Sequence, residues 1–298
     1  MPFAQGHAHA ISAPLLDHVV VLLDGATFQE IFACDMLREQ FARVKPKNVT
    51  SSVAGQYSAL GVAGENTLLE LFDGALPGSH RLTGGLVFSF EHPGSVQRAR
   101  EVLDAGPGGR YELVHRSSAD TGEPEPWYHM LRVDLGEDSP LLMFLNEVTG
   151  EYFDSVSARR GPDGELLRSG YLDAAFGAGT HDRRWLRDIT AVTLRARPQR
   201  AARMADALTA MGYRLTPAPP GPSGDAASDT GPTYRITGPG VDITLVGSAT
   251  APEGVLDITT DLHEAPRRHQ EFVFGDTSRL VLRQDGTAHW TFTPPAGG

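Results

Sequence analysis

A histidine interrupts an apolar segment near the N-terminus, LLDHVVVLLD at residues 15–24. If this segment is a β-strand, alternate side chains share one face, so His18 points in the same direction as Val20 and Leu22. A buried imidazole needs partners for both of its ring nitrogens. Each partner could be a carbonyl, a carboxylate, a water molecule or a metal ion. The other polar residues of the chain indicate which of these is available.

Three further titratable side chains lie on apolar faces of strand-like segments. Glu70 stands in TLLELFD, His129 in WYHMLRV and Glu147 in FLNEV. Imidazole and carboxylate groups are the side chains that most often bind first-row metals and transfer protons. Taken alone, each of them is more often a hydrogen-bonded core residue than a ligand, so their relative placement matters more than their presence.

Other kinds of chemistry find little support in the sequence. Tyr57, Trp127 and Tyr128 are candidates for lining a pocket, although aromatic residues in strands mostly pack in the core. The single cysteine, Cys34, excludes an intramolecular disulfide. No glycine-rich phosphate loop opens a helix and no Gly-x-Ser-x-Gly segment is present.

The composition is that of an ordinary globular protein of 298 residues, which is enough for one large domain or two smaller ones. A net charge of −11 argues against nucleic acid or an anionic membrane as the main partner. Lys45 and Lys47 are the only lysines, which we attribute to coding bias. The N-terminus has no signal-peptide pattern and no segment is long and apolar enough to span a bilayer, so we expect a cytoplasmic protein.

The elements that carry these residues follow a repeating order. After the first strand, TFQE at residues 27–30 predicts a capping box with Thr27 as N-cap and Glu30 reaching back, opening a helix that runs to residue 41. Strands are predicted at 49–53, 56–62 and 67–73. The order then returns as a strand at 84–91, a helix from residue 95, and strands at 111–116, 127–135 and 141–148.

The second half repeats the order after a stretch rich in Arg, Gly and Asp. A strand at 188–196 is followed by a helix with Pro198 at its first position, whereas a fourth unit from residue 255 has too few residues for a helix. We therefore predict an α+β fold of repeated βαβββ units in two paired halves, the fourth unit being degenerate. The predicted domains are 1–155 and 186–298, joined by a linker at 156–185.

This arrangement resembles the vicinal-oxygen-chelate superfamily, which includes glyoxalase I, bleomycin- and fosfomycin-resistance proteins and extradiol dioxygenases. LDHVVV opening a strand and LLELFD closing the unit carry the resemblance. The segments TFQEIFACDMLREQF, GQYSALGVAGENTLLELFD, LRDITAVTL and FGDTSRLVLRQDGTAHWTF are similar to an uncharacterised actinobacterial family of glyoxalase-like proteins. This likeness extends over most of the chain.

The resemblance implies a site at His18 and Glu70, because metal ligands in the superfamily come from the first and last strands of a unit, which lie side by side. The second unit departs from the pattern, since Gly85 and Met143 stand at its equivalent positions. His129 offers a substitute ligand. His18, Glu70 and His129 would then form the two-histidine, one-carboxylate set of non-haem Fe(II) enzymes.

The leading hypothesis is therefore a metal-dependent enzyme that acts on a small organic metabolite, as an oxygenase, isomerase or lyase. Fe(II) is favoured, with Mn(II), Zn(II) or Ni(II) as alternatives, and His129 or Glu147 would act as acid or base. The second half, with Thr193 and Thr244 at ligand positions, would support the first or mediate a homodimer. The main alternative is a metal-free protein that binds or sequesters a small molecule in the cup that paired units form in the superfamily. A purely structural module is a third alternative.

Overall fold

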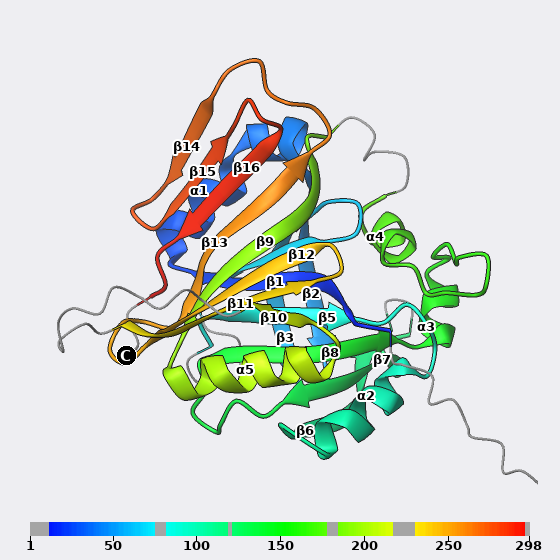
Figure 1. Ribbon diagram of the computed structural model, residues 1–298. Coiled ribbons are helices and arrows are strands. Elements are labelled where there is room, and N and C mark those ends of the chain that lie inside the picture. The colour runs from blue at the N-terminus through cyan, green and yellow to red at the C-terminus, as the bar shows by residue number, and fades with distance from the viewer. Residues whose placement is uncertain (1–11, 75–81, 119–120, 178–183, 217–229, 296–298) are drawn as a thin grey trace, which may run out of the picture.

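The computed structural model describes residues 12–74, 82–118, 121–177, 184–216 and 230–295 (Figure 1). The elements of the first half are, in chain order, β1 (Leu15–Leu23), α1 (Gly25–Ala33), the π-helical turn η1 (Leu37–Phe41), β2 (Arg43–Ser51), β3 (Gly55–Ala63), β4 (Leu68–Asp73), β5 (Gly84–Ser89), α2 (Ser95–Asp104), β6 (Gly109–Ser117), β7 (Pro124–Val133), β8 (Leu141–Val148), α3 (Gly150–Ser155) and α4 (Arg168–Phe176).

The second half begins with a long strand and a long helix. Its elements are β9 (Leu186–Ala196), α5 (Pro198–Ala210), β10 (Arg214–Thr216), β11 (Thr230–Gly238), β12 (Val241–Ser248), β13 (Gly254–Leu262), β14 (Gln270–Phe274), β15 (Ser278–Leu282) and β16 (Thr287–Phe292). Within the described residues, no helix is long and apolar enough to cross a membrane.

The eight strands of the first half form a closed barrel in the order β1-β4-β3-β2-β6-β7-β8-β5, with β5 returning to β1. β1 is parallel to β4 and antiparallel to β5, and β5 is parallel to β8. The seam between β2 and β6 is the weakest part of the wall, because Ser51 and Arg116 are the one residue pair that joins these strands.

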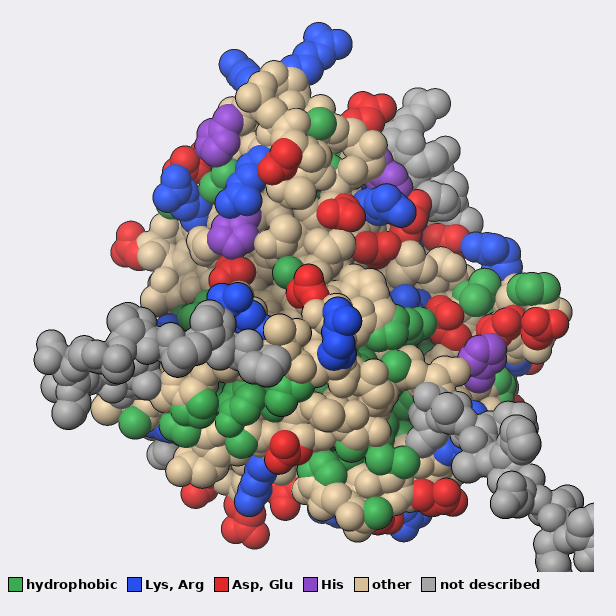
Figure 2. Space-filling model, viewed as in Figure 1, with side chains coloured by type: hydrophobic (Ala, Val, Ile, Leu, Met, Phe, Trp, Pro, Cys, Tyr) green, Lys and Arg blue, Asp and Glu red, His purple; other side chains and the backbone are tan. Residues whose placement is uncertain are grey.

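The second half forms an open eight-stranded sheet in the order β10-β11-β12-β9-β13-β16-β15-β14. One face of this sheet packs on α5 and on the outside of the barrel. The surface over β9, β13 and β16 in the view of Figure 1 carries scattered His, Lys or Arg, and acidic side chains and few hydrophobic ones (Figure 2). Residues 263–269, between β13 and β14, are described and contain no helix.

The wall of the barrel is apolar on both faces. Outward-pointing side chains such as Val19, Leu71 and Leu131 join one large core with residues of the second sheet. Inward-pointing side chains such as Val20 and Phe72 form separate clusters in the interior of the barrel. Alternation along β1, β4, β5 and β8 therefore divides their residues between the shared core and the barrel interior, whereas β2 also carries exposed residues.

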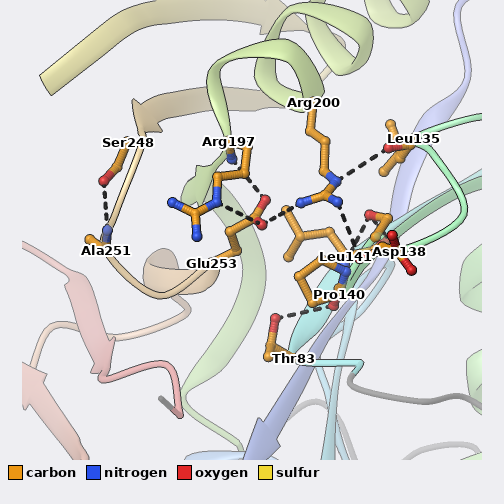
Figure 3. Close-up of polar contacts among 11 residues, drawn as sticks. Thr83, Leu135, Asp138, Pro140, Leu141, Arg197, Arg200, Ser248, Ala251 and Glu253 are labelled. Atoms are coloured by element: carbon orange, nitrogen blue, oxygen red, sulfur yellow. Dashed lines mark hydrogen bonds and ion pairs between the residues drawn. The ribbon is translucent and has the colours of Figure 1, made fainter. Parts of the chain in front are cut away.

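Polar contacts also join the two halves. Arg200 at the start of α5 forms an ion pair with the buried Glu253 and donates to the backbone carbonyls of Leu135 and Asp138 in the first half (Figure 3). At another point of the junction, Asp188 accepts hydrogen bonds from the backbone amides of the β3–β4 loop. The two halves have separate sheets and one shared core, and their division into domains at 156–185, of which 178–183 lie outside the described residues, stays a prediction.

The first helix differs from its prediction. Asp24, not Thr27, is its N-cap, since the Asp24 carboxylate accepts from the amide of Thr27 at 2.9 Å. The Thr27 hydroxyl instead contacts Thr277 and the Glu30 carboxylate accepts from Gly275, so both side chains bind the second half of the molecule. The capping-box prediction was wrong because local spacing cannot reveal these distant partners. The helix ends at Ala33, and η1 covers the remainder of the predicted span.

Candidate functional site

An irregularity in β1 places two titratable side chains next to each other. Leu16 pairs with Phe88 and His18 with Val87, which leaves Asp17 as an extra residue between two ladder pairs. Such a bulge turns a side chain away from strict alternation. Asp17 therefore reaches its neighbour, and Nδ1 of His18 donates to Oδ1 of Asp17 at 2.7 Å. This hydrogen bond fixes the orientation of the ring, and Nε2 faces the barrel interior.

Glu70 lies on the strand beside His18, as the strand phase predicts. β1 and β4 are parallel, and the Oε2 atom of Glu70 lies 3.6 Å from Nε2 of His18. The other carboxylate oxygen, Oε1, accepts a hydrogen bond from Nζ of Lys47 at 2.6 Å. A continuous series of contacts therefore runs from Asp17 through His18 and Glu70 to Lys47.

Opposite charges keep both carboxylates of this series ionised. Burial acts to raise the pKa of Glu70, but the charges of Lys47 and His18 outweigh it and lower the pKa below its usual 4.5. Burial acts in the same direction on Asp17, whose pKa is nevertheless lowered by its hydrogen bond to His18 and by the charges of His18 and Arg168.

Lys47 is a site residue that the sequence interpretation missed. Its side chain starts on β2 and crosses β3 to reach Glu70 on β4. The register of β3 pairs Ala59 with Lys47 and Gly61 with Glu70, so the intervening strand carries two small residues on that face. The sequence held one signal, since the chain has only two lysines, and the structure places both on one face of β2. The other, Lys45, donates to the carbonyl of Ala175 at 2.8 Å.

Aromatic rings line the barrel interior around this series. Phe144 contacts His18 edge-on and stacks on Tyr128, and Tyr57 packs against Phe72. The hydroxyls of Tyr57 and Tyr128 make no hydrogen bond to any described residue. Burial, together with the Glu70 charge, raises the pKa of both phenols well above the usual 10, so both stay protonated and can donate.

A helix from the predicted linker covers one end of the barrel, where α3 and α4 lie beyond the strands (Figure 1). Trp127 donates from its indole nitrogen to the hydroxyl of Tyr171 on α4 at 3.1 Å. Phe176 at the end of α4 packs on Gly61, where a Cβ atom would lie 2.7 Å from its ring. Trp127 therefore anchors α4 against the barrel. The sequence analysis did not predict α4, because the segment is rich in Arg and Gly and was interpreted as a linker.

His129 and Glu147 do not join the series. They are paired on β7 and β8 and point to the outside of the barrel, on the opposite wall face from Tyr128. Nδ1 of His129 forms a hydrogen bond of 2.8 Å with the hydroxyl of Tyr111, and the tautomer of the ring decides which of the two donates. Both Glu147 oxygens accept backbone amides, from Gly94 and Val96, at the start of α2. Glu147 therefore caps a helix, and His129 is not brought to His18 and Glu70.

The donor set does not fit the metal centre that the sequence resemblance implies. Within the described part of the chain, no group of three or more His, Cys, Asp or Glu side chains is arranged to hold a metal ion. Two of the expected ligands, His18 and Glu70, are close together, but the ammonium of Lys47 already binds the Glu70 carboxylate. The three-residue set that included His129 is not assembled, because His129 lies on the outer face of the wall.

The second half has neutral side chains at the equivalent place. Thr193 on β9 and Thr244 on β12 are direct strand partners. The His–carboxylate contacts there lie elsewhere: Nε2 of His289 is 3.2 Å from Oδ1 of Asp257 on the half-exposed face of the sheet.

Comparison with known proteins gives one family for this chain and several weak structural likenesses. No curated protein matches the chain. An extradiol ring-cleaving dioxygenase from B. fuscum matches with 14% identity and a TM-score of 0.45, over 97% of this chain and 76% of that one. The Mn(II)-bound glyoxalase from Novosphingobium aromaticivorans matches with 10% identity and a TM-score of 0.45, over 93% and 81%. A catechol 2,3-dioxygenase matches with 10% identity and a TM-score of 0.41, over 96% and 91%.

All three of these structures are at most 14% identical to this chain. At TM-scores below 0.5 they support no statement about activity, and the site has to be interpreted from its own residues. The model of one family matches residues 16–292, which is nearly the whole chain. The chain therefore belongs to a family of unknown function, DUF5829.

Proposed function

We propose that the barrel of the first half binds a small organic molecule without a metal ion. The observation that carries this proposal is the Lys47–Glu70 contact of 2.6 Å, because it supplies the Glu70 carboxylate with the positive charge that a metal would otherwise provide. A buried carboxylate that is already paired and hydrogen-bonded has little to gain from a second cation.

The interior surface supports a ligand with an aromatic or planar body. Phe144 is partly exposed and supplies apolar ring surface, and the hydroxyls of Tyr57 and Tyr128 supply polar groups that lack partners among the described residues. Binding sites for small molecules are commonly apolar with a few polar groups that fix orientation. The side chain of Lys47 is 24% exposed, so the polar end of the site retains contact with solvent.

A panel of small aromatic compounds tests this proposal. We expect at least one of benzoate, catechol, benzyl alcohol and benzylamine to bind, as measured by saturation-transfer NMR and by thermal stabilisation. Replacing Tyr57 and Tyr128 together by Phe removes two hydroxyls without changing ring volume and should weaken that binding. Tyr234→Phe, on the second sheet, is the matched control. Failure of every compound to bind, or equal binding by the double variant, would contradict the proposal.

The metal-dependent enzyme is a second candidate, and one observation favours it. The Nδ1 of His18 donates to Asp17, and metal-binding histidines usually donate their other ring N–H to a carboxylate. On this alternative His18 and Glu70 would bind Fe(II), Mn(II), Zn(II) or Ni(II) after Lys47 had moved away. Metal analysis of protein purified without chelator or affinity tag separates the two candidates, since a bound equivalent that is lost in Glu70→Gln would favour the enzyme.

The proposal also includes the organisation predicted from the sequence. The order strand, helix and three strands in β1–β4 and again in β5–β8 supports a repeat of βαβββ units. The fourth unit, β13–β16, keeps four strands and lacks the helix. A cytoplasmic location and a homodimer stay predictions.

A further inference from the structure

The cation beside Glu70 is a side chain rather than a bound ion. Glu70 stands at the position where the sequence resemblance implies a metal ligand, and the Nζ atom of Lys47 lies 2.6 Å from one of its oxygens. His18, the other implied ligand, lies 3.6 Å from the second oxygen. The Glu70 carboxylate therefore contacts the Lys47 ammonium through one oxygen and the His18 imidazole through the other. The ammonium lies where a divalent cation bound to Glu70 would have to lie.

We infer that Lys47 takes the place of the divalent cation in this site, and that the ligand of the barrel is a small planar molecule with an anionic oxygen, such as a carboxylate or a phenolate. This inference rests on the proposed function, because it specifies what the same site binds. An ammonium group attracts an oxyanion as a compact point charge, whereas it cannot activate dioxygen or exchange electrons.

The unpartnered groups around Lys47 are hydrogen-bond donors. An ammonium has three N–H groups, and one of them is used by Glu70. The other two find no acceptor among the described residues, and neither do the hydroxyls of Tyr57 and Tyr128. A ligand that satisfies this site must supply acceptors, and charge-assisted hydrogen bonds to an oxyanion are the strongest that these donors can make.

The surrounding carboxylates do not oppose this assignment, because each already has a partner. Asp17 accepts from His18 and faces Arg168, and Glu70 contacts both His18 and Lys47. Negative charge that enters next to the ammonium therefore meets carboxylates whose charge is largely offset. An uncharged planar molecule would fill the same aromatic walls but leave the ammonium donors without acceptors.

Exchanging the side chain of Lys47 tests whether it stands where a metal would. Lys47→His would complete a set of two imidazoles and one carboxylate with His18 and Glu70, and we expect it to bind about one Co(II) per chain, seen by its visible absorption. Lys45→His, on the same face of the same strand, is the matched control and should bind none in the site. Adding Glu70→Gln to Lys47→His should abolish binding. Stoichiometric Co(II) binding by the wild-type protein that Glu70→Gln removes would overturn the inference.

Ligand charge supplies the second test. Benzoate, benzyl alcohol and benzylamine share one ring and differ in charge, and we expect the wild-type protein to bind benzoate best. Lys47→Gln should weaken benzoate binding by about tenfold or more, the loss of one charge-assisted contact, and should weaken benzyl alcohol binding far less, whereas Lys45→Gln should change neither. If benzyl alcohol or benzylamine binds as well as benzoate, the inference fails and the proposed function stands. If none of the three binds, the proposed function itself fails.

Discussion

The barrel of the first half and the open sheet of the second half differ in where their charged side chains lie and in how these are paired. Inside the barrel each carboxylate of the series touches a basic side chain: Asp17 contacts His18, and Glu70 contacts both His18 and Lys47. At the equivalent strand positions of the second half, Thr193 and Thr244 carry no charge. The His289–Asp257 pair lies on a face where both side chains keep about a quarter of their surface exposed.

The difference follows from closure of the sheet. A barrel interior removes charges from water, so each charge has to be compensated within the protein. An open sheet leaves one face in contact with solvent, and charged pairs there contribute little to stability. The comparison therefore predicts that the same kind of substitution has a large effect in the barrel and a small one on the open sheet.

The largest expected effect is on removal of the Lys47 charge. Lys47→Met leaves Glu70 buried without its cation and should lower the free energy of unfolding by about 2–4 kcal/mol, measured by urea denaturation. Because Lys47 is partly exposed, this loss of unfolding free energy is smaller than the loss expected on breaking a fully buried ion pair. Replacing Lys47 and Glu70 together by Met should recover most of the loss, because neither charge is then left alone. A double variant as unstable as Lys47→Met would contradict the comparison.

A smaller effect is expected where α4 covers the barrel. Gly61→Ala places a Cβ atom 2.7 Å from the ring of Phe176, so the end of α4 has to move. The expected cost is about 1–2 kcal/mol, typical of mild overpacking. Adding Phe176→Ala should relieve the clash, and a variant with both changes should be no less stable than Phe176→Ala alone. Faster proteolysis between residues 156 and 177 in Gly61→Ala would show that α4 is the element displaced.

Acid should act on the barrel more than on the open sheet. A carboxyl whose pKa is lower in the folded than in the unfolded state stabilises the fold above the unfolded pKa, and this contribution is lost as the pH falls through the folded pKa. Glu70 has a lowered pKa, so stability should decline below about pH 4.5. The double Met variant of Lys47 and Glu70 should show a shallower decline in acid denaturation curves. The same slope in both proteins would show that Glu70 does not titrate as described.

The proximity of His18 and Glu70 was predictable because strands have a period of two, and the resemblance placed β1 beside β4. The position of His129 was predicted wrongly for a physical reason. Both faces of the barrel wall are apolar, one toward the interior and one toward the shared core, so alternation shows that His129 lies on an apolar face but not which one.

Asp17 and Lys47 were not predictable from local pattern. Asp17 reaches His18 because a bulge breaks the alternation of β1, and no residue in LLDHVV marks that bulge. Lys47 reaches Glu70 across an intervening strand, β3, and such a contact between strands that are not neighbours has no signature in the local sequence. The rarity of lysine in this chain was the one available signal, and it was attributed to coding bias.

The smallest effect is expected at the histidine of the open sheet. His289→Ala removes a partly exposed contact with Asp257 at 3.2 Å, and such pairs are worth about 0–1 kcal/mol. Unfolding stability should therefore change by about 0.5 kcal/mol or less, and the binding of aromatic probes in the barrel should not change. His18→Ala is the informative partner, since it leaves Asp17 and Glu70 facing each other without the imidazole between them and should impair both stability and binding. If His289→Ala lost probe binding while His18→Ala kept it, the site would belong to the second half, and closure of the sheet would not be what concentrates function in the barrel.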